Sequence, residues 1–120
     1  MKGTDQMPRW NSRTNLITTV LAGLALAGGF TVAFAAQQVI SQKGKAFSES
    51  AVTIKKGDTV MFVNDDNIDH NILSATVGNE FNLGSQAPGT SESVTFKNAG
   101  VVNVICAIHP RMKLAVTVAD

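Results

Sequence analysis

The residues of this chain that could do chemistry gather near its C-terminus. The segment Cys106-Ala107-Ile108-His109-Pro110-Arg111-Met112 holds the only cysteine and one of the two histidines; the other histidine, His70, lies upstream. One thiolate, two imidazoles and a thioether form the ligand set of a trigonal copper site with a weak, long axial methionine. Soft sulfur suits Cu(I) and imidazole suits both oxidation states, so one such site can hold either ion with little rearrangement. We therefore expect one copper ion bound by His70, Cys106, His109 and Met112.

Each of these residues also has an ordinary structural explanation when taken alone. A lone cysteine is usually a small buried hydrophobe, a lone histidine is more often a surface or core residue than a ligand, and Met112 could fill space in the core. A tetrahedral zinc site is a further alternative, because zinc accepts Cys and His, but methionine as the fourth ligand argues against it. Every Cys and His of the chain falls into one ligand pattern, and this favours copper.

Length and charge exclude several other classes of protein. The chain has 120 residues, enough for one domain, and a formal net charge of +1. So small a charge gives no basic surface of the kind that binds nucleic acid, and we expect no nucleic-acid partner. The sequence also contains no GxxxxGK phosphate loop, no GxGxxG motif and no HExxH motif.

The first 35 residues are typical of a secretory signal peptide. Basic residues precede Leu16 to Ala35, a stretch without charge that ends in the small-x-small cleavage pattern Ala33-Phe34-Ala35. The alternative is an uncleaved anchor, because about twenty apolar residues can span a bilayer. We expect cleavage after Ala35, export to the periplasm and a mature domain of residues 36–120. Exported proteins usually pair their cysteines, so an unpaired one there is best explained as a metal ligand.

The mature region predicts short strands separated by turns. The predicted strands are rich in β-branched and aromatic residues or alternate polar and apolar residues, and the turns are rich in Gly, Asn and Asp. Seven strands are predicted, at 51–54, 59–63, 70–73, 81–83, 92–96, 101–105 and 113–118, with a weaker edge strand near 38–40 or 46–48 and a loop over 84–90. Seven or eight such strands favour an all-β Greek-key β-sandwich. In that fold the last two strands are neighbours, so the loop between them would hold three ligands while His70 reaches the same end.

Together these features resemble the cupredoxins, the family of blue copper proteins. The matching motifs lie within residues 46–118: Lys55-Lys56-Gly57-Asp58-Thr59-Val60, Phe62-Val63-Asn64, His70-Asn71 and Cys106-x-x-His109-Pro110-x-Met112. The first part is a generic strand-turn-strand signal, whereas the His-Asn pair with the C-x-x-H-P-x-M loop is specific. The short gap between His109 and Met112 is similar to that of amicyanin and the small plastocyanin-like bacterial copper proteins.

The resemblance implies a type 1 (blue) copper centre and single-electron transfer, not an enzyme. It implies that Cys106 supplies the dominant thiolate bond, that His70 and His109 supply the imidazoles and that Met112 is the axial ligand. Two further roles follow from it. Asn71 would hold the His70 loop against the Cys106 loop, and Pro110, with fixed φ and no N–H, would stiffen the ligand loop. Ile108 departs from the proline often found before the second histidine.

Electrons are expected to pass mainly through His109, because its loop neighbours Ala107, Ile108 and Pro110 would form a small apolar docking patch. We expect a monomer that binds redox proteins transiently, such as a dehydrogenase, a cytochrome or an oxidase. It would contact a membrane only if the N-terminal segment is retained. The charges beside the ligands (Asp65, Asp66, Asp69, Arg111 and Lys113) are interpreted as a solvated rim, with electrostatic steering of a partner as the alternative.

Two other functions compete with electron transfer. A copper-binding or delivery protein more often has open sites rich in Met or His, and this chain has no such clusters. A catalytic copper site keeps an open position and usually needs more ligands, but no spare histidine exists; a binuclear copper site would need a second cysteine in the loop.

Overall fold

The computed structural model describes residues 3, 28–32 and 34–120 of the chain. Most of the expected signal peptide, residues 1–35, lies outside the described residues, so its removal stays a prediction. The chain from Val32 to Asp120 forms one compact unit. Among the described residues, we find no helix with the length and apolar character needed to cross a membrane.

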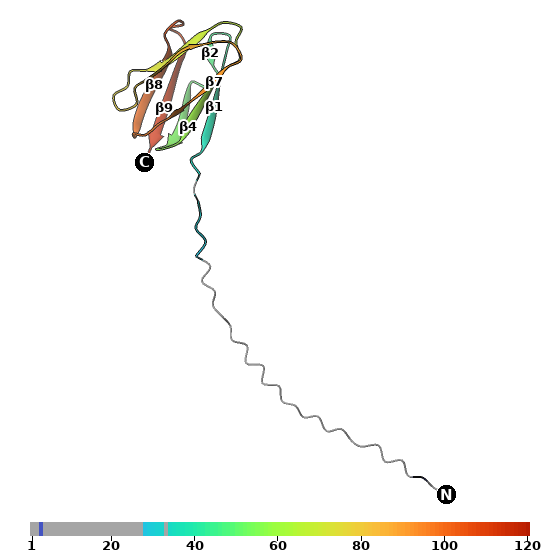
Figure 1. The fold of residues 1–120 in the computed structure, drawn as a ribbon. Coiled ribbons are helices and arrows are strands. Elements are labelled where there is room, and N and C mark those ends of the chain that lie inside the picture. Colours follow the sequence, from blue (N-terminus) through green and yellow to red (C-terminus); the bar gives the residue numbers. More distant parts are fainter. Residues whose placement is uncertain (1–2, 4–27, 33) are drawn as a thin grey trace. The chain divides into compact units, whose positions relative to one another are not determined.

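The described residues form nine strands and no helix, arranged in two sheets (Figure 1). In chain order the strands are β1 (Gln37–Lys43), β2 (Ala46–Phe47), β3 (Ala51–Lys55), β4 (Thr59–Asn64), β5 (His70–Ser74), β6 (Phe81–Gln86), β7 (Ser91–Thr95), β8 (Gly100–Cys106) and β9 (Lys113–Ala119). The prediction of an all-β fold is confirmed. The count is nine, rather than seven or eight, because strands form at both of the weak N-terminal positions.

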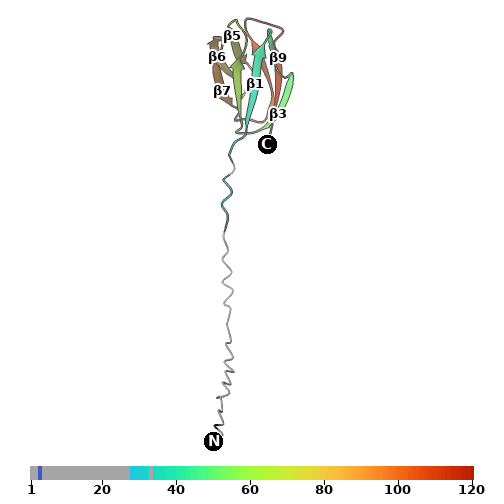
Figure 2. The same ribbon diagram turned by 90° about the vertical axis from the view of Figure 1, so that its right-hand side faces the viewer.

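The strand order is that of a two-sheet sandwich with crossing connections. One sheet has the order β2-β1-β4-β7 and the other the order β3-β9-β8-β5-β6. β1 is parallel to β4 and β3 to β9, whereas the other neighbouring strands are antiparallel. The chain therefore passes repeatedly from one sheet to the other, as in the predicted Greek-key sandwich. Figure 2 gives the view at a right angle, in which β1, β5 and β9 run along the same long axis.

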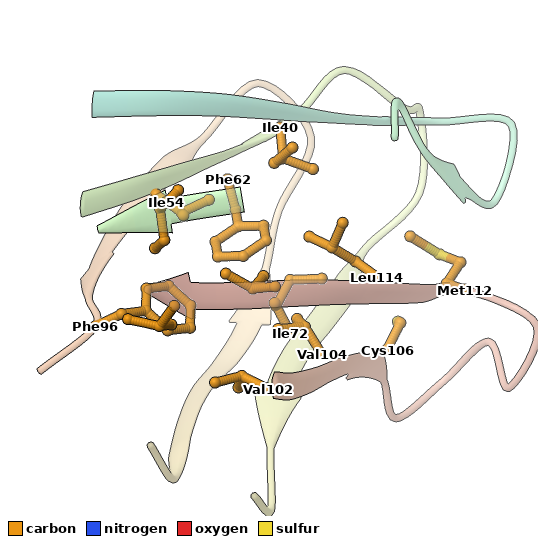
Figure 3. Packing of buried hydrophobic residues seen from close by; sticks show 13 residues of the cluster. Ile40, Ile54, Phe62, Ile72, Phe96, Val102, Val104, Cys106, Met112 and Leu114 are labelled. Carbon is orange, nitrogen blue, oxygen red and sulfur yellow. The ribbon is translucent and has the colours of Figure 1, made fainter. Parts of the chain in front are cut away.

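The apolar core lies between the sheets because the strands alternate buried and exposed residues. In β4, for example, Val60 and Phe62 are buried while their neighbours are partly exposed. Figure 3 shows apolar side chains from both sheets pointing into one space, with Phe96 toward one end and Cys106 and Met112 toward the other. The two sulfur atoms expected to bind copper thus lie at one end of the core.

The prediction of a loop over residues 84–90 is wrong at its start, because β6 continues to Gln86. A β-bulge in the pairing of β5 with β6 explains why the sequence pattern hides this part of the strand, and Gly84 has a φ of 69° there. A bulge sets two residues of one strand opposite one of its partner, so the two-residue alternation is interrupted. Beyond the bulge Gln86 pairs with His70, so β6 helps to position the first expected ligand.

Replacing Gly84 by alanine should lower the free energy of unfolding by about 1–2 kcal/mol, since a residue with a Cβ is strained at positive φ. No atom lies within 4 Å of a Cβ built at this position, so the backbone conformation alone causes the loss. Urea denaturation measures the effect. Glu92→Ala, at an exposed position of β7, is the control and should change stability by less than about 0.5 kcal/mol. Equal stability of Gly84→Ala and the wild type would show that the bulge does not need glycine.

Candidate metal centre

Two neighbouring strands bring His70 and Cys106 together. β5 begins at His70 and runs antiparallel to β8, with Ile72 directly opposite Cys106. Side chains two residues apart on a strand point to the same face, so His70 and Ile72 face the core with Cys106. All three are buried. The pairing of β5 with β8 therefore sets the thiol and the first imidazole side by side.

The loop between β8 and β9, residues 107–112, supplies the second imidazole. The N–H of Met112 donates to the carbonyl of His109 at 2.9 Å, and the N–H of Cys106 donates to the carbonyl of Met112 at 3.3 Å. These bonds close the loop into a tight turn, in which Met112 is buried and Pro110 is exposed. The role of Pro110 in stiffening this loop stays a prediction.

The donor atoms of the two histidines and the cysteine face a common centre. Nδ1 of His70, Sγ of Cys106 and Nδ1 of His109 all lie within 4.8 Å of one another. The two nitrogens are 3.2 Å apart, and the sulfur is 3.8 Å from Nδ1 of His70 and 3.7 Å from Nδ1 of His109. A metal ion placed at equal distance from these three atoms, in their plane, would lie about 2.1 Å from each of them. Metal–imidazole bonds are ~2.0–2.1 Å long and metal–thiolate bonds are ~2.3 Å long, so this distance is close to both. The cluster can hold one metal ion without a change of fold.

Backbone groups of Asn71 connect β5 to the cysteine. The N–H of Asn71 donates to Sγ of Cys106 at 3.3 Å, and the carbonyl of Asn71 accepts the N–H of Ala107 at 2.9 Å. The main chain of Asn71 thus joins the segments that carry His70 and Cys106, and the role of Asn71 toward a bound copper stays a prediction. Its side-chain oxygen is buried and finds no hydrogen-bond partner within the described part of the chain. A hydrogen bond to the sulfur removes electron density from a thiolate and so tunes the potential of a bound copper.

Burial differs among the four expected ligands. His70 is fully buried, Cys106 and Met112 are each 1% exposed, and His109 is only partly buried. Next to it, Ile108 is 52% exposed. Among the four expected ligands, only His109 is therefore partly accessible from the surface.

The far side of the His70 ring meets a carboxylate that sequence reasoning did not single out. Oδ2 of Asp66 lies 3.0 Å from Nε2 of His70, and the Asp66 side chain is only 11% exposed. The pKa of Asp66 is lowered to about 2, chiefly by the hydrogen bond from the N–H of Lys45 and also by bonds from His70 and the N–H of Asn67, while burial acts in the opposite direction. The sequence carries no clear signal for this pair, because a spacing of four residues brings side chains together on a helix, and this segment is a loop between β4 and β5.

The interpretation of three neighbouring aspartates as a solvated rim therefore holds for two of them. Asp65 and Asp69 are exposed and bond to the hydroxyl groups of Ser41 and Ser85. Asp66 instead belongs to the surroundings of the metal centre.

The donor set fits copper. A thiolate and two imidazoles in a triangle are the trigonal ligands of a blue-copper site, and a buried thioether lies at the same end of the core. The chain contains no other cysteine or histidine, so this cluster accounts for all of its nitrogen and thiolate ligands of that kind.

Comparison with known proteins gives the same metal. Residues 34–119 match the family described as copper binding proteins, plastocyanin/azurin family. The methylamine utilization protein MauL of Methylorubrum extorquens is 31% identical over 104 residues, which cover 86% of this chain and 91% of that protein.

Solved structures of copper proteins share the fold. A purple cupredoxin from Nitrosopumilus maritimus is 29% identical with a TM-score of 0.61, and the match covers 68% of this chain and 99% of that chain. A reduced Cu(I) form of an amicyanin variant, 22% identical, has a TM-score of 0.64 over 72% of this chain and 85% of that one, which shows the fold alone.

An enzyme is also among the similar structures. The copper-containing nitrite reductase of Thermus scotoductus is 26% identical with a TM-score of 0.65, but the match covers 71% of this chain and only 23% of that chain. The likeness is therefore to one part of a larger enzyme. With most of the sandwich matched by the family and a His-Cys-His cluster at its end, the chain belongs to the plastocyanin/azurin family of copper-binding proteins, the cupredoxins.

Proposed function

We propose that this protein is a type 1 copper electron carrier in which His70, Cys106 and His109 bind copper in a trigonal arrangement and Met112 is the axial ligand. The approach of three donor atoms to one centre carries the proposal. Bound copper supplies one-electron chemistry by alternating between Cu(I) and Cu(II). Membership of the family supports the choice of metal.

The packing of the ligands favours a carrier over a catalyst. His70 and Cys106 stand on paired strands of one sheet, and the turn that holds His109 is closed by main-chain hydrogen bonds. Side chains packed at the density of a protein interior have little room to move, so the geometry changes little when the charge of the centre changes. With four ligands in place and no further histidine or cysteine in the chain, no side chain of that kind is left to bind a substrate or a second ion.

Electrons would enter and leave through the partly buried ring of His109. Three residues of the same loop, Ala107, Ile108 and Pro110, are exposed and carry no charge, and we call them the docking patch. A carrier must bind two partners in turn and release both, which suits a small interface that buries less than about 1,200 Å². A monomer could bind both partners in turn through this one docking patch.

The partners would be redox proteins outside the cytoplasm, such as a dehydrogenase, a cytochrome or an oxidase. The relative in Methylorubrum extorquens is by name a methylamine utilization protein, which makes a redox enzyme of that process one class of partner to test. The signal-peptide pattern of residues 1–35 supports a location in the periplasm.

Export should remove residues 1–35 and leave Ala36 as the N-terminus, because the uncharged stretch ends in a small-x-small cleavage pattern. The intact mass of protein taken from its native compartment measures this. A mass that retains the first 35 residues would instead support a membrane anchor.

Wild-type protein loaded with Cu(II) should bind one copper per chain and show an intense visible charge-transfer band. Cys106→Ser should abolish the band, because the thiolate supplies the transition. Met112→Leu is the matched variant: it should keep the band and raise the reduction potential, since the axial ligand tunes it. Optical titration and voltammetry measure both. A wild type without a strong visible band would contradict the assignment of the site.

A charge on the docking patch should slow electron exchange and leave the metal centre unchanged. We expect Ile108→Glu to lower the rate of exchange with a redox partner by about tenfold or more, because a buried, unpaired charge weakens the encounter complex. Stopped-flow mixing measures the rate. Val101→Glu is the control: Val101 is 58% exposed, close to the 52% of Ile108, but lies at the opposite end of β8 from Cys106. Equal rates for the two variants would place the docking surface elsewhere, and a wild type too slow to serve any partner would favour copper delivery.

A further inference from the structure

The buried ring of His70 is held from both sides. Its Nδ1 faces Sγ of Cys106 and Nδ1 of His109, at 3.8 Å and 3.2 Å. Its Nε2 lies 3.0 Å from Oδ2 of Asp66, on the side away from the cysteine. A carboxylate accepts hydrogen bonds and does not donate them, so the proton of the neutral ring sits on Nε2 and the lone pair of Nδ1 points to the centre.

Asp66 is itself fixed by the surrounding backbone. Besides His70, its Oδ2 accepts the N–H of Lys45 at 3.0 Å, and its Oδ1 accepts the N–H of Asn67 at 3.1 Å. Its own N–H donates to Oδ1 of Asn64 at 3.0 Å. Asn64 is fully buried, and its amide nitrogen donates to two main-chain carbonyls, those of Ile68 and Gln86, at 2.9 Å each. The carboxylate can therefore not turn away from the imidazole without breaking several hydrogen bonds.

The hydrogen bond from Lys45 links Asp66 to a different part of the sandwich. Gly44 and Lys45 form the tip of the β1–β2 hairpin, with φ values of 61° and 58°. Positive φ at both central residues is the signature of a type I′ turn, in which Lys45 occupies a conformation that side chains rarely adopt. This turn directs the N–H of Lys45 at the carboxylate. The hairpin of one sheet thus supports a ligand that stands on the other sheet.

We propose that Asp66 is a positioning residue of the copper centre, which fixes the tautomer and orientation of His70 and stabilises Cu(II) relative to Cu(I). A carboxylate that accepts the second N–H of a metal-bound imidazole makes the ligand more basic. Its negative charge, in a place largely shielded from water, favours the oxidation state with the larger positive charge. The inference rests on the proposed function, since it takes His70 to be a copper ligand.

The decisive variant is Asp66→Asn, which keeps the shape and an acceptor oxygen but removes the charge. The ratio of Cu(II) to Cu(I) affinity should fall by about tenfold, and the reduction potential should rise by about 59 mV, which is the same change expressed for a one-electron couple. Asp65→Asn is the matched control, because it removes the same charge from the adjacent, exposed residue that bonds to Ser41 and not to His70. Its potential should stay close to that of the wild type. Equal potentials in the two variants would overturn the role of Asp66.

A second measurement needs neither copper nor a variant. Nitrogen-15 NMR of the histidine rings in the metal-free wild type should show a proton on Nε2 of His70, the nitrogen that faces Asp66. A ring without a proton on Nε2 would overturn the positioning role. The two proposals can fail separately. A wild type without a blue band overturns the proposed function, whereas a blue wild type whose potential does not respond to Asp66→Asn overturns only the inference about Asp66.

Discussion

The structure of the metal centre depends on the main-chain hydrogen bonds that join Asn71 to the end of β8. One bond reaches Sγ of Cys106 and the other reaches the N–H of Ala107. These bonds lie where the pairing of β5 with β8 ends. They fix the position of His70 relative to Cys106. They also fix the start of the ligand loop at Ala107. Because both groups belong to the backbone, this connection depends on the fold and not on the side chain at position 71.

The two sheets contribute different parts of the metal centre. The sheet that contains β5 and β8 carries His70 and Cys106, both buried at one end of the core. The other sheet contributes the β1–β2 hairpin and Asn64, whose hydrogen bonds fix Asp66 behind the imidazole of His70. Of the four expected ligands, only His109 is partly exposed. A buried centre with one partly exposed imidazole is suited to pass an electron while the rest of the site is kept from solvent.

Much of this could be predicted from the sequence, because few residue types carry the relevant chemistry. One cysteine and two histidines admit only one constellation, and the alternation of residues in β4 and β9 predicts the faces that form the core. The missed features arise where contacts are distant in sequence. The sequence pattern hides the last residues of β6, because a bulge at Gly84 breaks the alternation. The sequence does not distinguish Asp66 from its exposed neighbours, because its burial depends on the hairpin around Lys45, 21 positions away.

We propose that the copper ion is bound by one thiolate and two imidazoles at a site that the folded chain already forms. X-ray absorption at the copper edge of the loaded protein tests it most directly, since it reports the identity and distance of the atoms bound to the metal. We expect two imidazole nitrogens at about 2.0–2.1 Å from copper and one short copper–sulfur bond. All three bonds should be present in both oxidation states. A first shell without a short copper–sulfur bond would contradict it.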